Sequence, residues 1–257
     1  MSVIALASAK GSPGVTTTAL ALAAVWPRRV LVADCDPSGG DLAGWLGQPS
    51  TPGLVTLGPL ARRGLGPAEV WAQTQPAGGS LRVLTGFARP DQARAVMALW
   101  QQLPVALARL GVDVLADCGR LDPVSPALAV ARAADVVAVL ARPDAAGVAH
   151  LEPCLRLLSD QGAAPVVVLL GDRPYRPAEV AAALAERGVG AEVVGVVLPD
   201  PAAARRLAGG PGSDRALARS LLIRSARLLA DTLTRGRIQP TPAHDNPTRV
   251  VVRDAED

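Results

Sequence analysis

The chain has 257 residues, of which 49% are apolar and 19% charged, and its formal net charge at pH 7 is +3. This is the composition of a globular protein with enough apolar material for a sizeable core. No apolar run approaches the roughly 18 residues that a membrane-spanning helix needs, and the N-terminus lacks the basic start of a signal peptide. The three cysteines are too scattered for a disulfide framework or a zinc site, so we expect a cytoplasmic protein with no integral membrane segment.

Short apolar runs alternate with segments of helical spacing along most of the chain. Strands are predicted at Val3–Ala7, Val30–Ala33, Leu81–Leu84, Val112–Ala116, Val136–Leu140, Val166–Leu170 and Val193–Leu198. Helices are predicted at Thr16–Val25, Asp91–Arg109, Gly147–Gln161, Pro177–Arg187 and Asp214–Arg235. Several strands are continuous Val and Leu runs, which is typical of strands buried on both faces of a parallel sheet. The alternation predicts an α/β fold, with a mostly parallel twisted sheet flanked by helices.

Two segments fall outside this alternation. Residues 49–80 are rich in Gly and Pro, and we predict a loop region there with a short helix near Pro67–Gln73. Residues 238–257 contain three prolines and no helical period, which is typical of a mostly disordered tail. The sequence therefore predicts one domain over residues 1–237, followed by that tail.

The stretch "ASAKGSPGVTTT" contains Lys10, and the other 25 of the 26 Lys and Arg side chains are arginine. A glycine-containing turn from Lys10 to Val15 connects the first predicted strand to the helix that begins at Thr16. Such a turn points backbone N–H groups and the positive end of the helix dipole at one spot, which favours a phosphate. A lysine acts as a compact point charge among phosphates, which is a reason to keep one here. The alternative is an ordinary strand–turn–helix junction with a threonine cap.

Aspartates follow the ends of two further predicted strands. Asp34 and Asp36 lie at the end of the second strand, and Asp117 follows the strand at Val112–Ala116. These side chains are expected at the same edge of the sheet as the glycine-containing turn. A carboxylate there can hold Mg²⁺ through water, and Asp36 can orient a water for attack on a terminal phosphate. Together with the turn, they predict a Mg-nucleotide site.

Over roughly residues 1–235 the sequence resembles the ParA/MinD family of deviant Walker A ATPases. The family's phosphate loop reads Lys-Gly-Gly-x-Gly-Lys-Thr-Thr, and this chain has "KGSPGVTT" from Lys10 to Thr17. "DCDP" at Asp34–Pro37 is similar to the family's Asp-x-Asp-Pro switch, and Asp117 is similar to its Walker B aspartate. "ADVVAVLARPD" and "VVGVVLPD" resemble the following core strand and the last strand, each with its loop.

The resemblance implies a P-loop NTPase fold of the SIMIBI-like type and a homodimer that closes around ATP and Mg²⁺. The nucleotide-binding residues it implies are Lys10, Gly11, Ser12, Gly14, Val15, Thr16 and Thr17, with Pro199 and Asp200 near the adenine. The implied metal-binding residues are Thr16, Asp36 and Asp117. Lys10 would reach the partner's nucleotide, and Lys10 and Asp36 would be the catalytic residues. The implied function is a nucleotide switch with weak ATPase activity that positions DNA or a cellular machine through an unidentified protein partner.

The phosphate loop departs from the family's pattern. Val15 stands where the second lysine belongs, Ser12 replaces a glycine, and Pro13 has no backbone N–H to donate. Loss of one charge-assisted contact costs ~1.5–3 kcal/mol of binding, so we expect weakened nucleotide binding with slow or lost hydrolysis. The family's adenine-facing asparagine is also absent from "LLGDRP" at Leu169–Pro174, and Arg120 is a candidate for partial compensation of the lost charge.

Two alternatives remain open at this point. Val15 is compatible with a catalytically degenerate scaffold or DNA-binding module that hydrolyses nothing. The spacing from the glycine turn to Asp34 also suits an NAD-binding Rossmann enzyme, in which that carboxylate binds a ribose. The Rossmann fingerprint, however, has no role for Lys10 or for the threonines from Thr16 onward.

Residues 205–237 are strongly basic, with eight arginines against Asp214 and Asp231. The predicted helix at Asp214–Arg235 has an expected apolar stripe at Leu217, Leu221 and Leu228. Sequence-independent contact with DNA phosphates is one interpretation of this segment, and a solvated helix face with packed side-chain stems is the other. The candidate DNA contacts are Arg205, Arg206, Arg215, Arg219, Arg224 and Arg227.

Overall fold

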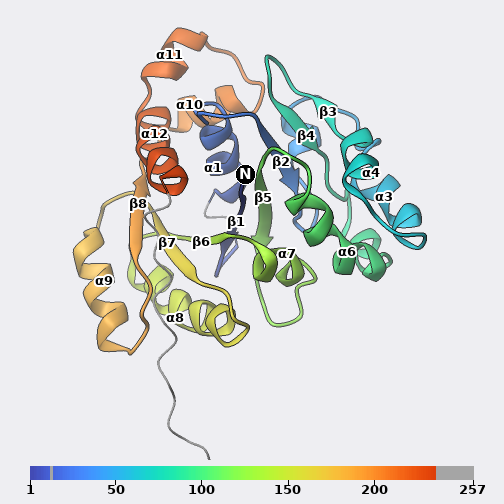
Figure 1. The fold of residues 1–257 in the computed structure, drawn as a ribbon. Coiled ribbons are helices and arrows are strands. Elements are labelled where there is room, and N and C mark those ends of the chain that lie inside the picture. The colour runs from blue at the N-terminus through green and yellow to red at the C-terminus, as the bar shows by residue number, and fades with distance from the viewer. Residues whose placement is uncertain (12–13, 236–257) are drawn as a thin grey trace, which may run out of the picture.

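The computed structural model describes residues 1–11 and 14–235; Ser12, Pro13 and the predicted tail at 238–257 lie outside the described residues. One sheet with the strand order β3-β4-β2-β5-β1-β6-β7-β8 forms the centre of the described part (Figure 1). All its pairings are parallel except that of β3 with β4, which confirms the predicted α/β class. The strands are β1 (Val3–Ser8), β2 (Val30–Asp34), β3 (Gln75–Pro76), β4 (Arg82–Leu84), β5 (Asp113–Arg120), β6 (Val136–Ala141), β7 (Pro165–Leu170) and β8 (Val193–Val197).

Helices cover both faces of the sheet (Figure 1). Side chains of α1, α10 and α12 pack on one face, and side chains of α3, α6, α7, α8 and α9 pack on the other. The helices are α1 (Val15–Ala23), α2 (Leu42–Trp45), α3 (Leu54–Ala61), α4 (Pro67–Ala72), α5 (Pro90–Arg94), α6 (Met97–Ala108), α7 (Leu128–Ala133), α8 (Ala145–Asp160), α9 (Pro177–Glu186), α10 (Pro201–Leu207), α11 (Asp214–Arg219) and α12 (Leu221–Thr234). None of these helices combines the length and the hydropathy needed to cross a bilayer.

The central strand β1 shows why the predicted strands read as continuous apolar runs. Ile4 and Leu6 contribute to the core under α1 and α12, whereas Val3, Ala5 and Ala7 contribute to the core on the opposite face. Successive side chains of a strand point to opposite faces, so a sheet covered on both sides needs an apolar residue at every position. Every strand predicted from such a run is present, with bounds that differ by a few residues.

Two predicted helices are wrong as single elements. The segment Asp91–Arg109 divides into α5 and α6, and the Trp100 Nε1–H donates a hydrogen bond to the Ala93 carbonyl across the break at 2.9 Å. The segment Asp214–Arg235 divides into α11 and α12 at Ser220, whose hydroxyl caps the amino end of α12. In both cases a local hydrogen bond stabilises the interruption, which helical spacing alone does not reveal.

The predicted loop region at 49–80 also contains regular structure. The short helix expected near Pro67–Gln73 is present as α4, but α3 was not predicted, because Gly53 and Pro59 are loop signals in the sequence. The Thr56 Oγ1 accepts a hydrogen bond from the Gly53 N–H at 2.9 Å and thereby closes the start of α3. The glycine is therefore a helix cap in this context.

Of the apolar stripe predicted at Leu217, Leu221 and Leu228, only Leu217 packs against the core, and the two positions on α12 are wrong. Leu221 is 49% exposed and Leu228 is 71% exposed. Because α12 starts afresh at Ser220, its buried face runs through Leu222, Ala226 and Leu229 instead, against α1 and β8. The exposed face of α12 consequently includes leucines as well as arginines.

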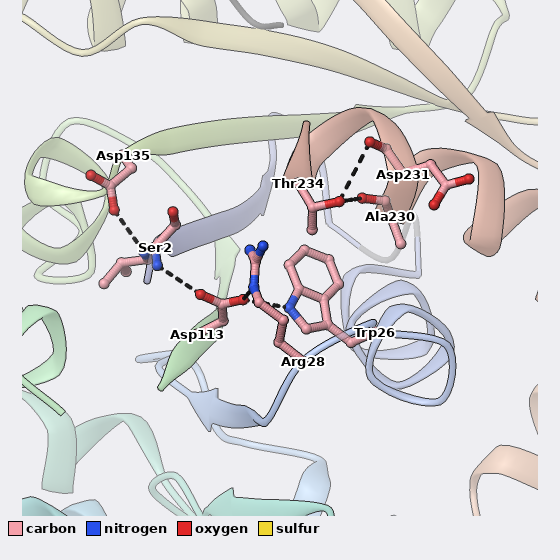
Figure 2. Close-up of polar contacts among 9 residues, drawn as sticks. Ser2, Trp26, Arg28, Asp113, Asp135, Ala230, Asp231 and Thr234 are labelled. Atoms are coloured by element: carbon pink, nitrogen blue, oxygen red, sulfur yellow. Dashed lines mark hydrogen bonds and ion pairs between the residues drawn. The ribbon is translucent and has the colours of Figure 1, made fainter. Parts of the chain in front are cut away.

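At the amino edge of the sheet, the buried Asp113 connects β1, β5 and the segment after α1 (Figure 2). Its carboxyl group accepts hydrogen bonds from the Ser2 backbone N–H at 2.8 Å, the Trp26 Nε1–H at 2.9 Å and the Arg28 Nε–H at 2.6 Å. Asp135 accepts the next amide along β1 at 2.7 Å. Burial acts to raise the pKa of Asp113, but these hydrogen bonds outweigh it, and the pKa is lowered.

We expect Asp113→Ala to lower the free energy of unfolding by about 2 kcal/mol, because the buried indole N–H and the Ser2 amide lose their acceptor. Urea denaturation at pH 7 measures this difference. Because the folded-state pKa is lowered, the contribution of Asp113 is present above its unfolded value of about 3.9 and is lost as the pH falls through the folded value. Asp91→Ala, which removes an exposed ion pair with Arg89, is the control and should change stability little. Equal effects of the two substitutions would contradict the role of Asp113.

Candidate functional site

The candidate site lies at the carboxyl edge of the sheet, where β1 runs through a turn into α1. Gly14 precedes the helix with a φ of +89°, a left-handed conformation that glycine adopts without strain. The Thr18 backbone N–H and hydroxyl both donate to the Gly14 carbonyl at 2.9 Å. No side chain among the described residues caps the first turn of α1, and no acidic residue lies in it. The amide groups at this helix end are therefore oriented for an anion.

A cavity of about 290 Å³ lies between this helix end and the ends of β2 and β5. Among the described residues that line it, acids and hydroxyls are frequent and none is a cation. Its lining residues are Ser8, Gly14, Val15, Thr16, Asp36, Asp41, Trp45, Asp117 and Gly119. The fold thus brings Thr16, Asp36 and Asp117 together, as the sequence predicts.

Asp117 is the most constrained acid of this cavity. Its Oδ2 accepts a hydrogen bond from the Thr16 hydroxyl at 2.6 Å, and its Oδ1 accepts one from the Gly119 N–H at 3.0 Å. Burial raises the pKa of Asp117 to about 6 against these two hydrogen bonds, which lower it. The adjacent hydroxyl and carboxylate are hard oxygen donors, so this pair fits Mg²⁺ if phosphate oxygens and water complete the coordination.

Asp36 approaches Asp117 from the end of β2. Its Oδ1 accepts the Ser38 N–H at 2.7 Å, and burial raises its pKa. Gly119, with a φ of +59°, faces this carboxyl group so closely that a Cβ there would collide with it. No group of three His, Cys, Asp or Glu side chains suited to a metal occurs in residues 1–11 and 14–235, so an all-protein metal cage is not formed.

Asp34 lies behind the cavity and is almost wholly buried. Its Oδ2 accepts the Leu42 N–H at 3.1 Å, while no described group bonds its Oδ1. Desolvation, followed by the negative charge of Asp117, raises the pKa of Asp34 well above its ordinary value. Asp34 therefore holds the start of α2, and α2 in turn carries Trp45 at the cavity.

A second cavity of about 410 Å³ lies on the opposite side of the turn, toward β7 and β8. Its lining residues include Gly14, Thr17, Pro199 and Asp200. The structure therefore brings Pro199 and Asp200, which were predicted near the adenine, close to the turn. The carboxyl group of Asp200 is engaged in the fold, since it accepts the Ala203 N–H at 3.1 Å and the Leu221 N–H at 3.3 Å. Its side chain therefore holds the starts of α10 and α12.

A third cavity of about 240 Å³ contains Lys10 and Gly11, and the first turns of α8 form its other wall. Lys10 is exposed and does not line the acidic cavity, where Val15 stands instead, 6% exposed. Within a single chain, the lone lysine is thus separated from the carboxylates. Arg120, the candidate for compensation, is exposed at the end of β5 and lines none of these cavities.

Several lining residues were not predicted. Asp41 and Trp45 reach the acidic cavity from α2, and Arg142 and Arg173 reach the cavity toward β7 and β8. The sequence offers a weak signal for the arginines, because each lies two or three residues after the end of a predicted strand. The sequence gives no signal for α2, because a helix of four residues is too short to show a helical hydrophobic period.

The candidate DNA-binding arginines lie on α10, α11 and α12. Arg206 donates to Asp214 at 2.8 Å, so this pair is partly neutralised. The remaining five are exposed, and no ion pair involves them within the described residues. They are Arg205, Arg215, Arg219, Arg224 and Arg227.

The fold that carries this turn and these strand-end acids matches that of solved MinD and ParA-type ATPases. MinD from Pyrococcus horikoshii OT3, solved with Mg-ADP, superimposes with a TM-score of 0.71 at 17% identity, over 91% of this chain and 96% of that one. A ParA family ATPase from Chlorobium tepidum TLS gives 0.71 at 19% identity, over 89% and 98%. A variant of McdA from Cyanothece, solved as a complex with ATP, gives 0.66 at 19% identity, over 90% and 95%. No protein-family model and no curated protein matches the sequence.

We expect Asp117→Asn to stabilise the metal-free protein at pH 7.5 by about 2 kcal/mol and to have little effect near pH 4. The folded-state pKa of about 6 lies above the unfolded value, so the proton held by Asp117 stabilises the fold fully below about pH 4. That stabilisation is lost as the pH rises through 6. Thermal unfolding in EDTA at the two pH values measures it, with Asp160→Asn at an exposed helix end as the control. A stability difference between Asp117→Asn and the original protein that does not change with pH would contradict the raised pKa of Asp117.

Proposed function

We propose that this chain is a member of the ParA/MinD family that binds an adenine nucleotide with Mg²⁺ and uses the bound state as a switch. One observation carries the proposal: the uncapped amino end of α1 meets the Thr16–Asp117 pair at a cavity of about 290 Å³. Amide groups there suit phosphate oxygens, and the hydroxyl and carboxylate suit a hard cation. The NAD-binding alternative gives no role to this pair.

In this proposal, one part of the nucleotide occupies the acidic cavity and the other part occupies the cavity toward β7 and β8. The terminal phosphate and Mg²⁺ belong to the acidic cavity of Thr16 and Asp117, and the ribose and base belong to the cavity that Thr17 and Pro199 line. Mg²⁺ would neutralise phosphate charge that the acidic cavity otherwise repels. In this proposal, the predicted domain over residues 1–237 contains every residue of the site.

Hydrolysis requires an oriented water and stabilisation of charge on the terminal phosphate. Asp36 lies in the right cavity to hold the water, but Val15 supplies no cation, so the rate is expected to be low. A scaffold that hydrolyses nothing is the alternative. Phosphate release above background that disappears in Asp36→Ala would exclude that alternative.

Dimerisation follows from the position of Lys10 in this proposal. Its side chain is exposed at the rim of the site and does not line its own acidic cavity, which suits contact with the nucleotide of a second copy. A nucleotide-dependent homodimer would then present a surface to a protein partner in the cytoplasm and position DNA or a cellular machine.

Isothermal titration with Mg-ATP and Mg-ADP, run beside light scattering, tests the proposal. We expect saturable binding of both nucleotides, and ATP-dependent association that is lost in Lys10→Ala because the charge between the subunits is removed. Arg94→Ala, at an exposed position of α5, is the control and should associate like the original protein.

Two results would count against this assignment. No binding at millimolar nucleotide would overturn the proposed function altogether. Tight ATP-driven dimers of the Lys10→Ala protein would remove the lysine from the intersubunit role while leaving nucleotide binding in place.

Contact with DNA is a second candidate function, favoured by the exposed arginines of α11 and α12. We expect the combined change of Arg219, Arg224 and Arg227 to Gln to weaken binding to a short labelled duplex. It should also reduce the slope of log K against log salt by roughly 2 to 3, because three phosphate contacts are lost. Fluorescence anisotropy across a salt series measures both quantities.

The matched control removes the same charge from another surface, by changing Arg62, Arg63 and Arg94 to Gln. These side chains are exposed near α3 and α5. If both triple variants lose the same affinity, net charge and not the α11–α12 surface controls the interaction.

A further inference from the structure

The phosphate loop lacks one cation, and the acidic cavity does not replace it. Val15 occupies the position of the second loop lysine, and the charged groups around it are Asp36, Asp41 and Asp117. A nucleotide with several negative charges cannot be held there by amide groups and Mg²⁺ alone without loss of affinity. A cation that compensates for this loss would come from another element near the turn.

Arg142, directly after β6, is the arginine placed to supply it. It lines both the cavity of about 410 Å³ beside Gly14 and Thr17 and the cavity of about 240 Å³ beside Lys10. Arg142 is thus adjacent to the turn on two sides, at the end of the strand beside β1. β6 pairs directly with β1, which accounts for this position.

The backbone that carries Arg142 is held at several points. Gly147 of α8 approaches the Arg142 carbonyl so closely that a Cβ would collide with it. The Pro143 carbonyl accepts the Tyr175 N–H at 3.0 Å, and the Asp144 Oδ1 accepts the Gly147 N–H at 2.7 Å. The base of the arginine is therefore preorganised, which lowers the entropic cost of placing its guanidinium on a ligand.

The guanidinium itself is available. Arg142 is exposed and has no side-chain hydrogen bond or ion pair within residues 1–11 and 14–235. Asp144 lines the same two cavities, but its carboxylate caps α8. Arg173, the other arginine of the larger cavity, contacts the Asp172 carbonyl at 3.4 Å and does not reach the side of Lys10.

We propose that Arg142 binds the phosphates of the nucleotide nearest the ribose and supplies the positive charge that position 15 lacks. This inference rests on the proposed function, because it assigns a residue to the same nucleotide site. A guanidinium can donate two parallel hydrogen bonds to phosphate oxygens, which an ammonium cannot do in the same plane. Because Arg142 does not line the cavity of Asp36 and Asp117, it would not contact the terminal phosphate, and its contribution is the same for ATP and ADP.

Titration of Mg-ATP and Mg-ADP into Arg142→Gln tests this inference. We expect both affinities to fall by roughly 10- to 100-fold and by the same factor, as for loss of one charge-assisted contact. Arg142→Lys should lose less, since it keeps the charge and loses the second hydrogen bond. Arg94→Gln, an exposed arginine on α5, is the matched control and should bind like the original protein.

The outcomes separate this inference from the proposed function. If the original protein binds neither nucleotide, the proposed function fails. If it binds and Arg142→Gln binds equally well, or loses no more than Arg94→Gln, only the role of Arg142 is overturned. A loss confined to ATP would also overturn it, because that result would place the guanidinium at the terminal phosphate.

Discussion

The amino end of α1 and the carboxyl group of Asp117 meet across the hydroxyl of Thr16, and the site depends on this junction. The helix end presents amides that no described side chain caps, whereas the buried carboxyl group and its neighbours present negative charge. Apolar strands covered on both faces bury the acid, and burial raises its pKa to about 6. The same parallel sheet delivers the turn and the strand-end acids to one edge. A protein built this way is prepared for a polyanion together with a cation.

Charge is distributed unevenly round the phosphate loop. The carboxyl groups lie on the β2–β5 side together with Val15, whereas Lys10 and Arg142 lie on the β6 side. A nucleotide in the proposed position would therefore have Arg142 of its own subunit near the ribose and depend on Mg²⁺ at its terminal phosphate. This separation favours binding over hydrolysis, because charge that develops at the terminal phosphate has no fixed cation beside it. This distribution of charge is the reason why the proposed function is a switch that responds to nucleotide occupancy and not rapid turnover.

Much of the fold and part of the site could be predicted from the sequence. The continuous apolar runs indicate buried strands, and the position of Lys10 before a glycine turn indicates a phosphate loop, because both signals are local. Helix interruptions were missed at Ser220 and after Arg94, where a local hydrogen bond stabilises the break. The face of α12 was wrong for the same reason, since a new helix start resets which residues are buried.

The sequence by itself determined the kind of structure and the chemistry of the loop, because strand burial and turn geometry depend on residues that are neighbours in the chain. Only the tertiary structure decided which side chains surround that loop. Asp41, Arg142 and Arg173 reach the cavities from segments far apart in sequence, and the sheet order β2-β5-β1-β6-β7 brings them there. Strand order is set by packing of the helices over both faces, which no local pattern encodes.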